Sequence, residues 1–233
     1  MNKETHPVSV LLSAYNAQDT IEVAINSILN QTYKNHELLI MDDGSTDDTL
    51  KICNYFEKKF TNVRVFKNIK NIGLTKSLNI LSRNAKGEYL ARQDSDDFSL
   101  EKRLERQLNY INKHNLKACT TRARVKESEK IIPRLSYYLP KKAVLKFKNP
   151  FIHGTLMIKK QIFNNVGSYD ERFYYSQDYK LMTDLTSANY KVKILKEVHY
   201  VLNMENNIST NFHKEQMYFA ECVRKNKSPV EKI

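Results

Sequence analysis

A regular alternation of short apolar runs with helix-like segments, over the first hundred residues, constrains the fold of this chain more than any other feature. The strand-like runs, which are mostly apolar, are residues 8–12, 37–41, 63–66 and 88–91. Between them, apolar residues recur every three or four positions, as they do in amphipathic helices. The pattern predicts βαβ units with right-handed crossovers. We therefore expect an α/β fold with a mixed, mainly parallel, Rossmann-like sheet flanked by helices.

A cluster of polar residues directly follows each expected strand. The four clusters are residues 13–16, 42–45, 68–73 and 94–97. The carboxyl ends of parallel strands lie at one edge of a sheet, and α/β sheets bind their ligands beyond that edge. We therefore expect the four clusters to form a single binding site.

The second half of the sequence is less regular. We expect helices at 101–114 and 212–224, strands at 151–158 and 191–195, and loops with one short helix at 120–148. No apolar run approaches the ~20 residues of a membrane-spanning helix. The first residues contain no apolar stretch of signal-peptide type, which predicts a cytoplasmic protein. Three widely spaced cysteines favour reduced thiols over a disulfide framework or a zinc site.

The formal net charge of +12 is the unusual bulk property. It is compatible with a solvated, lysine-rich surface, or with an anionic partner. No helix carries the stripe of basic and aromatic residues that is typical of nucleic-acid binding. A peripheral contact with anionic membrane lipid fits better, through the basic segment 120–148 and the basic tail, at the inner face of the cell membrane.

Residues 94–97, Asp-Ser-Asp-Asp, place three carboxylates beyond the fourth strand. Mg²⁺ and Mn²⁺ prefer oxygen ligands, commonly one or two carboxylates together with phosphate oxygens. An acidic loop or helix cap would have the same composition, but the register with the other three clusters favours a metal site at Asp96 and Asp94. The Asp-Asp-Gly-Ser of 42–45 fits a ligand contact as well as a turn that caps the next helix.

Two common phosphate-binding sequences are missing from this chain. The first strand is not followed by Gly-x-Gly-x-x-Gly, and no loop ends in Gly-Lys-Ser/Thr. A bound diphosphate would therefore need its charge neutralised by a metal ion.

Longer segments carry a more specific pattern, at residues 8–16, 28–33, 39–47, 71–79 and 87–97, followed by Arg103 and Gln107, and later at 151–157, 167–171 and 177–181. In this order they resemble family 2 glycosyltransferases with the GT-A fold, of the kind that builds bacterial exopolysaccharide, capsule and lipopolysaccharide chains. The resemblance implies one catalytic domain, 1–211, with a nucleotide-sugar half (1–100) and an acceptor half (101–211). Residues 212–233 would add a helix and a basic tail.

The resemblance also implies a role for individual residues. The nucleotide sugar, with UDP as the favoured carrier, would contact Ser13, Ala14, Tyr15, Asn16, Asp43, Lys76, Asp94 and Ser95. Asp96, with Asp94, would hold Mn²⁺ or Mg²⁺. Asp178 would be the catalytic base, and His153 would line the acceptor pocket. Read from the sequence alone, Asp178 could instead cap a helix, and His153 could be an ordinary structural histidine.

These roles predict an inverting transfer to a saccharide or lipid-linked saccharide hydroxyl, with a carboxylate base on one face and a neutralised leaving group on the other. A nucleotidyltransferase and a non-catalytic sugar-nucleotide binding module are the alternatives, and a nucleic-acid-binding protein ranks third. Three positions depart from the pattern. Gln177 replaces a glutamate, and Leu202 and Met204 stand where many relatives have arginine and histidine. The replacements at Leu202 and Met204 predict a reduced affinity for the metal ion, unless His199 takes the place of the missing histidine.

Overall fold

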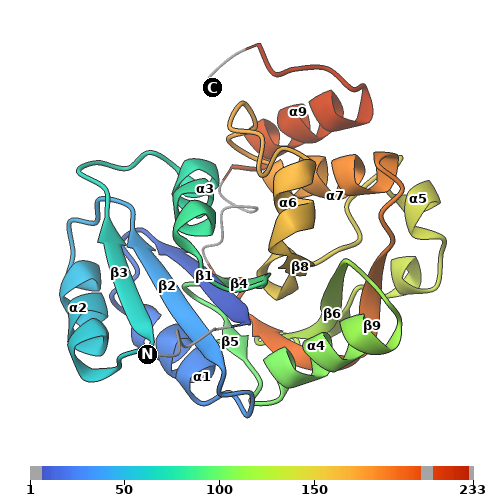
Figure 1. Cartoon of the computed structure of the whole chain (residues 1–233). Coiled ribbons are helices and arrows are strands. Elements are labelled where there is room, and N and C mark those ends of the chain that lie inside the picture. The colour runs from blue at the N-terminus through green and yellow to red at the C-terminus, as the bar shows by residue number, and fades with distance from the viewer. Residues whose placement is uncertain (1–6, 206–211, 231–233) are drawn as a thin grey trace.

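A twisted mixed sheet forms the centre of the protein, for which the computed structural model describes residues 7–205 and 212–230 (Figure 1). Within these ranges the strand order is β3-β2-β1-β4-β8-β6-β9-β5, with β7 paired to β6. Four neighbouring strands are parallel, namely β1 (Val8–Ala14), β2 (His36–Asp42), β3 (Val63–Lys67) and β4 (Tyr89–Asp94). They are the four strands expected from the alternating pattern.

The remaining strands extend the sheet beyond β4. They are β5 (Phe98–Ser99), β6 (Ala118–Val125), β7 (Ile131–Ile132), β8 (Met157–Lys159) and β9 (Val192–Leu202). β8 runs antiparallel to β4 and β6, whereas β9 runs parallel to β6 and antiparallel to β5. The predicted mixed, mainly parallel sheet is therefore present.

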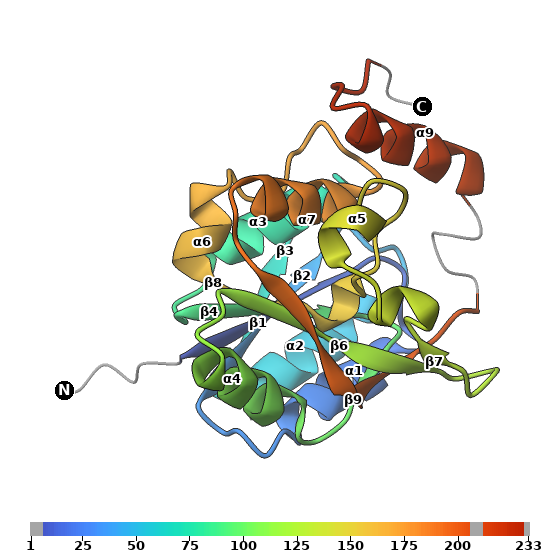
Figure 2. The ribbon, with the colours of Figure 1, turned by 90° about the vertical axis from the view of Figure 1, so that its right-hand side faces the viewer.

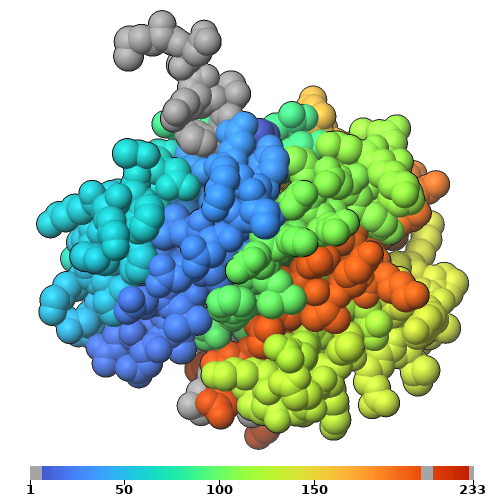
Figure 3. Space-filling model, turned by 90° about the horizontal axis from the view of Figure 1, so that it is seen from below, coloured from blue at the N-terminus to red at the C-terminus, as the bar shows by residue number. Residues whose placement is uncertain are grey.

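Helices cover both faces of the sheet (Figures 1 and 2). One face carries α1 (Ile21–Leu29), α2 (Thr49–Lys59) and α4 (Arg103–Lys113), whose blue, cyan and green surfaces are seen in Figure 3. The other face carries α3 (Leu74–Asn84), α6 (Lys160–Asn165) and α7 (Gln177–Ser187). Shorter elements are η1 (Leu135–Tyr137), α5 (Lys141–Val144) and η2 (His153–Thr155). The last helix, α9 (His213–Arg224), packs on α7.

Alternate residues of β1 enter two separate cores. Val8, Val10 and Leu12 pack with the residues of α1, whereas Leu11 packs with those of α3 and α7. Since both faces are buried, the strand needs apolar residues in succession, and this explains why the sequence shows continuous runs instead of strict alternation. The cores leave the carboxyl ends of the parallel strands free to carry polar side chains.

Two expectations for the second half were wrong. Residues 118–125, expected to lie largely in a loop, form the long strand β6, because pairing with β8 and β9 satisfies a backbone rich in threonine and arginine. The strand expected at 151–158 begins only at Met157, and His153 lies in the single turn η2. The helix expected at 212–224 is present as α9.

The predicted domain boundary at residue 211 lies outside the described residues, so the division at that point stays a prediction. Helix α9 contributes Phe219, Cys222 and Val223 to the same core as α3 and α7. Among the helices that the structure describes, none is long and apolar enough to span a membrane.

Candidate functional site

The loops after β1 and β2 are joined by hydrogen bonds between their polar residues. Asn16, at φ 48°, donates its backbone N–H to Ser45 Oγ at 3.0 Å, and its side-chain Oδ1 accepts the Thr46 N–H at 2.9 Å. The predicted loop of residues 13–16 is shorter than expected, because Ser13 and Ala14 are the last residues of β1. In the structure Asn16 therefore joins two loops at the sheet edge.

Asp43 organises the loop after β3. Its Oδ1 accepts hydrogen bonds from Asn68 Nδ2 (2.8 Å) and the Ile72 N–H (3.0 Å), and its Oδ2 accepts one from the Gly73 N–H (2.9 Å). The carboxylate is buried. One acceptor position of Oδ2 is left for a ligand. The predicted turn at 42–45 is present, with the Ser45 N–H bonded to Asp42 Oδ2, but Asp48, not this turn, precedes α2.

Two half-exposed tyrosines lie close to Asp43. Tyr15 is 48% exposed and Tyr174 is 50% exposed. Burial, and then the charges of Asp43 and Tyr15, raise the pKa of Tyr174 above its ordinary value. The Tyr174 ring packs on Gly73, at φ 92°, where a Cβ would lie 2.6 Å from the ring edge. The two rings therefore lie near the buried Asp43 carboxylate at the carboxyl edge of β1 and β2.

Asp94, at the end of β4, has fixed partners on both sides. Its Oδ1 is ion-paired with the buried Arg92, and its backbone N–H donates to Tyr200 Oη at 3.1 Å. Gly154 of η2 passes so close that a Cβ there would lie 2.5 Å from Tyr200 Oη and in conflict with Asp94 Oδ2. Strand register places Asp94 beside Ser13 of β1. The carboxylate is therefore held at the shared edge of β1 and β4.

The charged forms of Asp96 and Asp97 are disfavoured in the folded protein. Burial, and then repulsion by Asp94, raise the pKa of Asp96 to about 6. Burial and the charges of Asp94 and Asp96 raise the pKa of Asp97 as well, although it accepts the Asn203 N–H at 2.8 Å. Asp96 accepts a hydrogen bond from its own backbone N–H and forms no ion pair with any of the described residues. Ser95 is half-buried between Asp94 and Asp96.

These carboxylates fit a divalent cation that a bound diphosphate completes. The described residues contain no cluster of three or more His, Cys, Asp or Glu side chains arranged to hold a metal by themselves. Mg²⁺ and Mn²⁺ need only one or two carboxylates when phosphate oxygens and water supply the rest. The carboxylate of Asp96, which lacks an ion-pair partner among the described residues and is repelled by Asp94, is the donor that such an ion would stabilise.

His153 is within electrostatic reach of both Asp94 and Asp178. Its Nε2 is 2.7 Å from Tyr169 Oη. Burial, and then the charge of Arg92, lower the pKa of His153 to about 4, whereas Asp178 and Asp94 act on it in the opposite direction. The same two carboxylates raise the pKa of Tyr169, after burial. Asp94 and Asp178 thus face a common neutral pair of side chains.

Asp178 occupies the first turn of α7. Its Oδ2 accepts a 2.7 Å hydrogen bond from Asn149 Nδ2, and the Asn149 side-chain oxygen accepts the Phe151 N–H at 3.0 Å. Ser176, at φ 56°, is the residue that precedes the helix, so the helix-cap alternative for Asp178 was wrong. Asp43 follows β2 and Asp96 follows β4 at the carboxyl edge of the parallel strands, whereas Asp178 lies in α7 and shares His153 as an electrostatic neighbour with Asp94.

Four other positions that the sequence analysis considered are Lys76, His199, Leu202 and Met204. Lys76 is exposed on the first turn of α3 and forms no ion pair within the described residues. His199 lies on β9 beside Tyr200, and successive strand residues point to opposite faces. Because Tyr200 contacts Asp94, His199 points away from the acidic cluster and does not substitute there. Leu202 ends β9, and Met204 is partly exposed beyond it.

The sequence did not single out Tyr174, Tyr200 and Asn149 as site residues. Tyr174 and Tyr200 are separated from their partners by about a hundred residues, and neither belongs to a polar cluster. Asn149 lies in the lysine-rich segment, where charge dominates the pattern. Gly154 carried a signal, because it lies in one of the segments that resemble the family.

A family model described as glycosyl transferase family 2 matches residues 9–169, which include all of β1 except its first residue, the parallel strands β2, β3 and β4, and η2. The chain belongs to glycosyl transferase family 2. The putative glycosyltransferase EpsE of Bacillus subtilis is 34% identical over 169 residues, which is 70% of this chain and 59% of EpsE. The O-antigen biosynthesis glycosyltransferase WbnJ of Escherichia coli is 34% identical over 179 residues, covering 75% of this chain and 69% of WbnJ.

Solved structures show the same fold at low sequence identity. TarS of S. aureus (residues 1–349), in complex with UDP, matches with a TM-score of 0.73 and 21% identity, over 96% of this chain and 67% of that one. The mannosyltransferase PcManGT of Pyrobaculum calidifontis, in complex with GDP-Man and Mn²⁺, matches with a TM-score of 0.74 and 18% identity, over 96% and 66%. The predicted GT-A-type fold and the resemblance to family 2 are confirmed. This chain spans about three-fifths of EpsE.

Proposed function

We propose that this family 2 glycosyltransferase moves a sugar from a nucleotide diphosphate donor to a saccharide or lipid-linked saccharide hydroxyl during surface polysaccharide assembly, with inversion at the anomeric carbon. One observation supports this most. Asp94 and Asp178, which come from separate elements, both act on the pKa values of His153 and Tyr169, so the two carboxylates lie near the same pair of side chains.

The donor would lie across the carboxyl ends of β1 and β2. Tyr15 and Tyr174 offer ring faces to the base, and Asp43 offers one remaining acceptor position, which suits the N–H of uracil. Ser13, Ala14, Asn16 and Ser95 would border the nucleotide, and Lys76 would approach the nucleotide only if its exposed side chain turned toward it. TarS was solved with UDP and PcManGT with GDP-Man, so these two structures do not select one base. UDP is the favoured carrier because the carboxylate of Asp43 can accept the N–H of uracil.

Asp96, with Asp94, would hold Mn²⁺ or Mg²⁺, which would neutralise charge on the departing diphosphate. The mannosyltransferase neighbour was solved with Mn²⁺. Arg92 holds Oδ1 of Asp94 in an ion pair, and Oδ2 of Asp94 lies beside Gly154. With the leaving group neutralised in this way, the reaction needs no protein acid.

Asp178 would accept the proton of the acceptor hydroxyl. The hydroxyl oxygen then attacks the anomeric carbon from the face opposite the diphosphate, the bond from that carbon to the diphosphate oxygen breaks, and the configuration inverts. Asn149 holds one oxygen of Asp178 and orients the other. His153, neutral because its pKa is near 4, would line the acceptor side without adding charge.

The basic segment 120–148 and the end of α9 would bring the protein to an anionic membrane, at the inner face of the cell membrane, where lipid-linked acceptors are held. A nucleotidyltransferase would need a glycine-rich basic loop after β1, and residues 13–16 are Ser-Ala-Tyr-Asn.

A panel of nucleotide sugars tests the proposal, with thermal shift and donor hydrolysis measured with and without Mn²⁺. We expect one or a few donors to stabilise the protein only when Mn²⁺ is present, and to be hydrolysed slowly. Asp178→Asn should keep the donor-induced shift and lose transfer by about 100-fold or more. Donor binding by the wild-type chain with no hydrolysis or transfer would instead support a binding module, and binding to none of the panel would contradict the proposal.

A further inference from the structure

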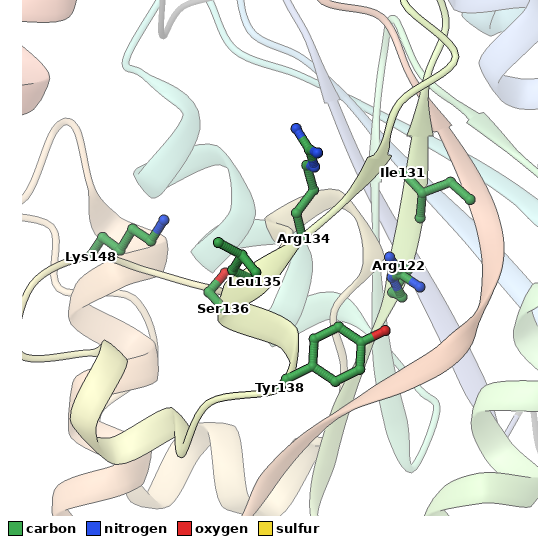
Figure 4. Close-up of a pocket in the computed structure, with 7 residues that line it drawn as sticks. All are labelled: Arg122, Ile131, Arg134, Leu135, Ser136, Tyr138 and Lys148. Carbon is green, nitrogen blue, oxygen red and sulfur yellow. The ribbon is translucent and has the colours of Figure 1, made fainter.

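A cavity of about 600 Å³ opens beside η1 (Figure 4). Three of its lining residues are cations from separate segments: Arg122 from β6, Arg134 from the residue before η1, and Lys148 from the chain after α5. Ile131, Leu135, Ser136 and Tyr138 complete the lining. The cavity is thus part cationic and part apolar.

None of the three cations has an acidic partner within the described residues. Arg122 stacks over the Tyr137 ring at 5.1 Å, and its buried Nε donates to no described atom. Segment 120–148 holds nine lysine or arginine residues against two glutamates. Both glutamates are engaged elsewhere, Glu129 with Arg124 and Glu127 with the Met204 N–H. The cavity therefore presents uncompensated positive charge.

Large apolar side chains surround this charge and point into solvent. Leu135 is 82% exposed, and Tyr138 and Phe147 are each 75% exposed. The turn that presents them is fixed, because Lys141 Nζ donates hydrogen bonds to the carbonyls of Ser136, Tyr137 and Leu139. Exposed apolar side chains next to unpaired cations are typical of proteins that lie at the surface of an anionic bilayer.

The patch continues toward α9 and toward the proposed acceptor site. Arg224 Nη1 of α9 donates to the Phe147 carbonyl at 3.5 Å, so the basic end of that helix adjoins the patch. Lys148 immediately precedes Asn149, which is bonded to Asp178. A membrane in contact with this patch would lie on the side from which a lipid-linked acceptor must arrive.

We propose that the cavity binds the phosphate of an anionic phospholipid headgroup, and that Leu135, Tyr138 and Phe147 enter the interfacial layer of the bilayer around it. Arg122, Arg134 and Lys148 carry three positive charges, which exceed the single negative charge of one phosphodiester and can neutralise it. These charges favour a lipid phosphate, and the exposed apolar side chains around them favour a bilayer over a soluble phosphate. The site rests on the membrane contact proposed above, and its test does not depend on the transfer reaction.

Vesicle flotation of the whole chain tests this site. We expect binding to phosphatidylcholine vesicles that contain phosphatidylglycerol, and little binding to phosphatidylcholine alone. The double variant Arg134→Gln/Lys148→Gln should lower the partition coefficient by about tenfold or more, since each cation near the surface contributes substantially to binding. Leu135→Ser/Phe147→Ser should lower the binding that survives at high salt, because screening removes only the electrostatic part.

A matched control removes the same charge from the other face of the sheet. Lys58→Gln/Lys113→Gln replaces two exposed lysines on α2 and α4, and should change binding by no more than about twofold. An equal loss in this control would show diffuse attraction and overturn the site. Binding that requires a polyprenyl diphosphate, and that phosphatidylglycerol does not support, would also overturn it. Donor-induced thermal shifts, measured on the same variants, check that they are folded and report on the transferase proposal separately.

Discussion

Asn149 Nδ2 donates a 2.7 Å hydrogen bond to Oδ2 of Asp178, and the Asn149 side-chain oxygen is itself fixed by the Phe151 N–H. This pair joins the segment that follows α5 to the first turn of α7. The other oxygen of Asp178, Oδ1, has no hydrogen-bond partner within the described residues and is left to receive a proton. Asn149 is therefore a positioning residue for the proposed base.

Removing the Asn149 amide should slow sugar transfer without weakening the binding of the donor. We expect Asn149→Ala to lower kcat by about tenfold, with the donor Kd within about twofold of wild type, because the carboxylate remains but loses its orientation. Asn164→Ala, which truncates an exposed asparagine on α6, is the control and should change neither value. A loss of donor affinity that matches the loss of kcat would indicate a general structural effect.

Asp96→Asn should stabilise the protein when no metal is present. The pKa of Asp96 is raised to about 6 in the fold, above the value of an unfolded chain. Its contribution to stability is therefore present below about pH 4 and is lost as the pH rises through 6. At pH 7.5 the amide avoids this loss, and we expect the free energy of unfolding to increase by about 1–2 kcal/mol.

The same substitution should remove the response to metal. In wild type, Mn²⁺ with a nucleotide diphosphate should raise Tm, and in Asp96→Asn this shift should be largely absent. Tm measured at pH 4 and 7.5, with and without Mn²⁺, checks both effects. Asp48→Asn, an exposed carboxylate before α2, serves as the control. If Asp96→Asn were less stable than wild type at pH 7.5 without metal, the cost of burying a charged carboxylate beside Asp94 would not be the dominant effect at this site.

Tyr174→Ala should weaken nucleotide binding, since a half-exposed ring beside Asp43 is available to contact the base. An aromatic–base contact contributes about 1–3 kcal/mol, so Kd for UDP should rise by about fivefold or more. Tyr55→Ala, which removes an exposed ring on α2, is the matched control. Calorimetry of UDP with both variants makes the comparison, and an unchanged Kd for Tyr174→Ala would place the base elsewhere.

The parallel half of this fold follows closely from the sequence, whereas the second half does not. A strand buried on both faces needs a mostly apolar run, and residues 8–12, interrupted only by Ser9, and 38–41 are such runs. β6 alternates threonine, arginine and alanine and is held by β8 and β9, which follow it in the chain. Local pattern could not distinguish that strand from a loop, because its partners are distant in sequence.

The site divides in the same way. Asp43, Asp94 and Asp96 follow strands directly, so the edge of the sheet brings them together, and the sequence pattern was sufficient to find them. Tyr174 meets Gly73, and Tyr200 meets Asp94, only through the tertiary fold. The detailed role of Asp43 could not be read from the sequence either, because its bonds to Ile72 and Gly73 depend on the path of a loop.

His153→Gln should reduce the dependence of the free energy of unfolding on pH below about 6.5. The pKa of His153 is lowered to about 4 by burial and by the charge of Arg92, well below the value near 6.5 of an unfolded chain. Between these two values the unfolded chain binds the additional proton, so this residue contributes stability above pH 6.5 that is lost as the pH falls toward 4. We expect a loss of about 2 kcal/mol over that interval in wild type and a smaller one in His153→Gln.

Denaturant unfolding at several pH values, with His114→Gln as the exposed-histidine control on the end of α4, measures this slope. The acceptor KM of the same variant then separates the two roles for His153. If the histidine only supports Tyr169 through its 2.7 Å contact, glutamine should restore that hydrogen bond and leave the acceptor KM unchanged. If the ring lines the acceptor pocket, the acceptor KM should rise while the donor Kd stays constant, because only the acceptor would contact the substituted side chain.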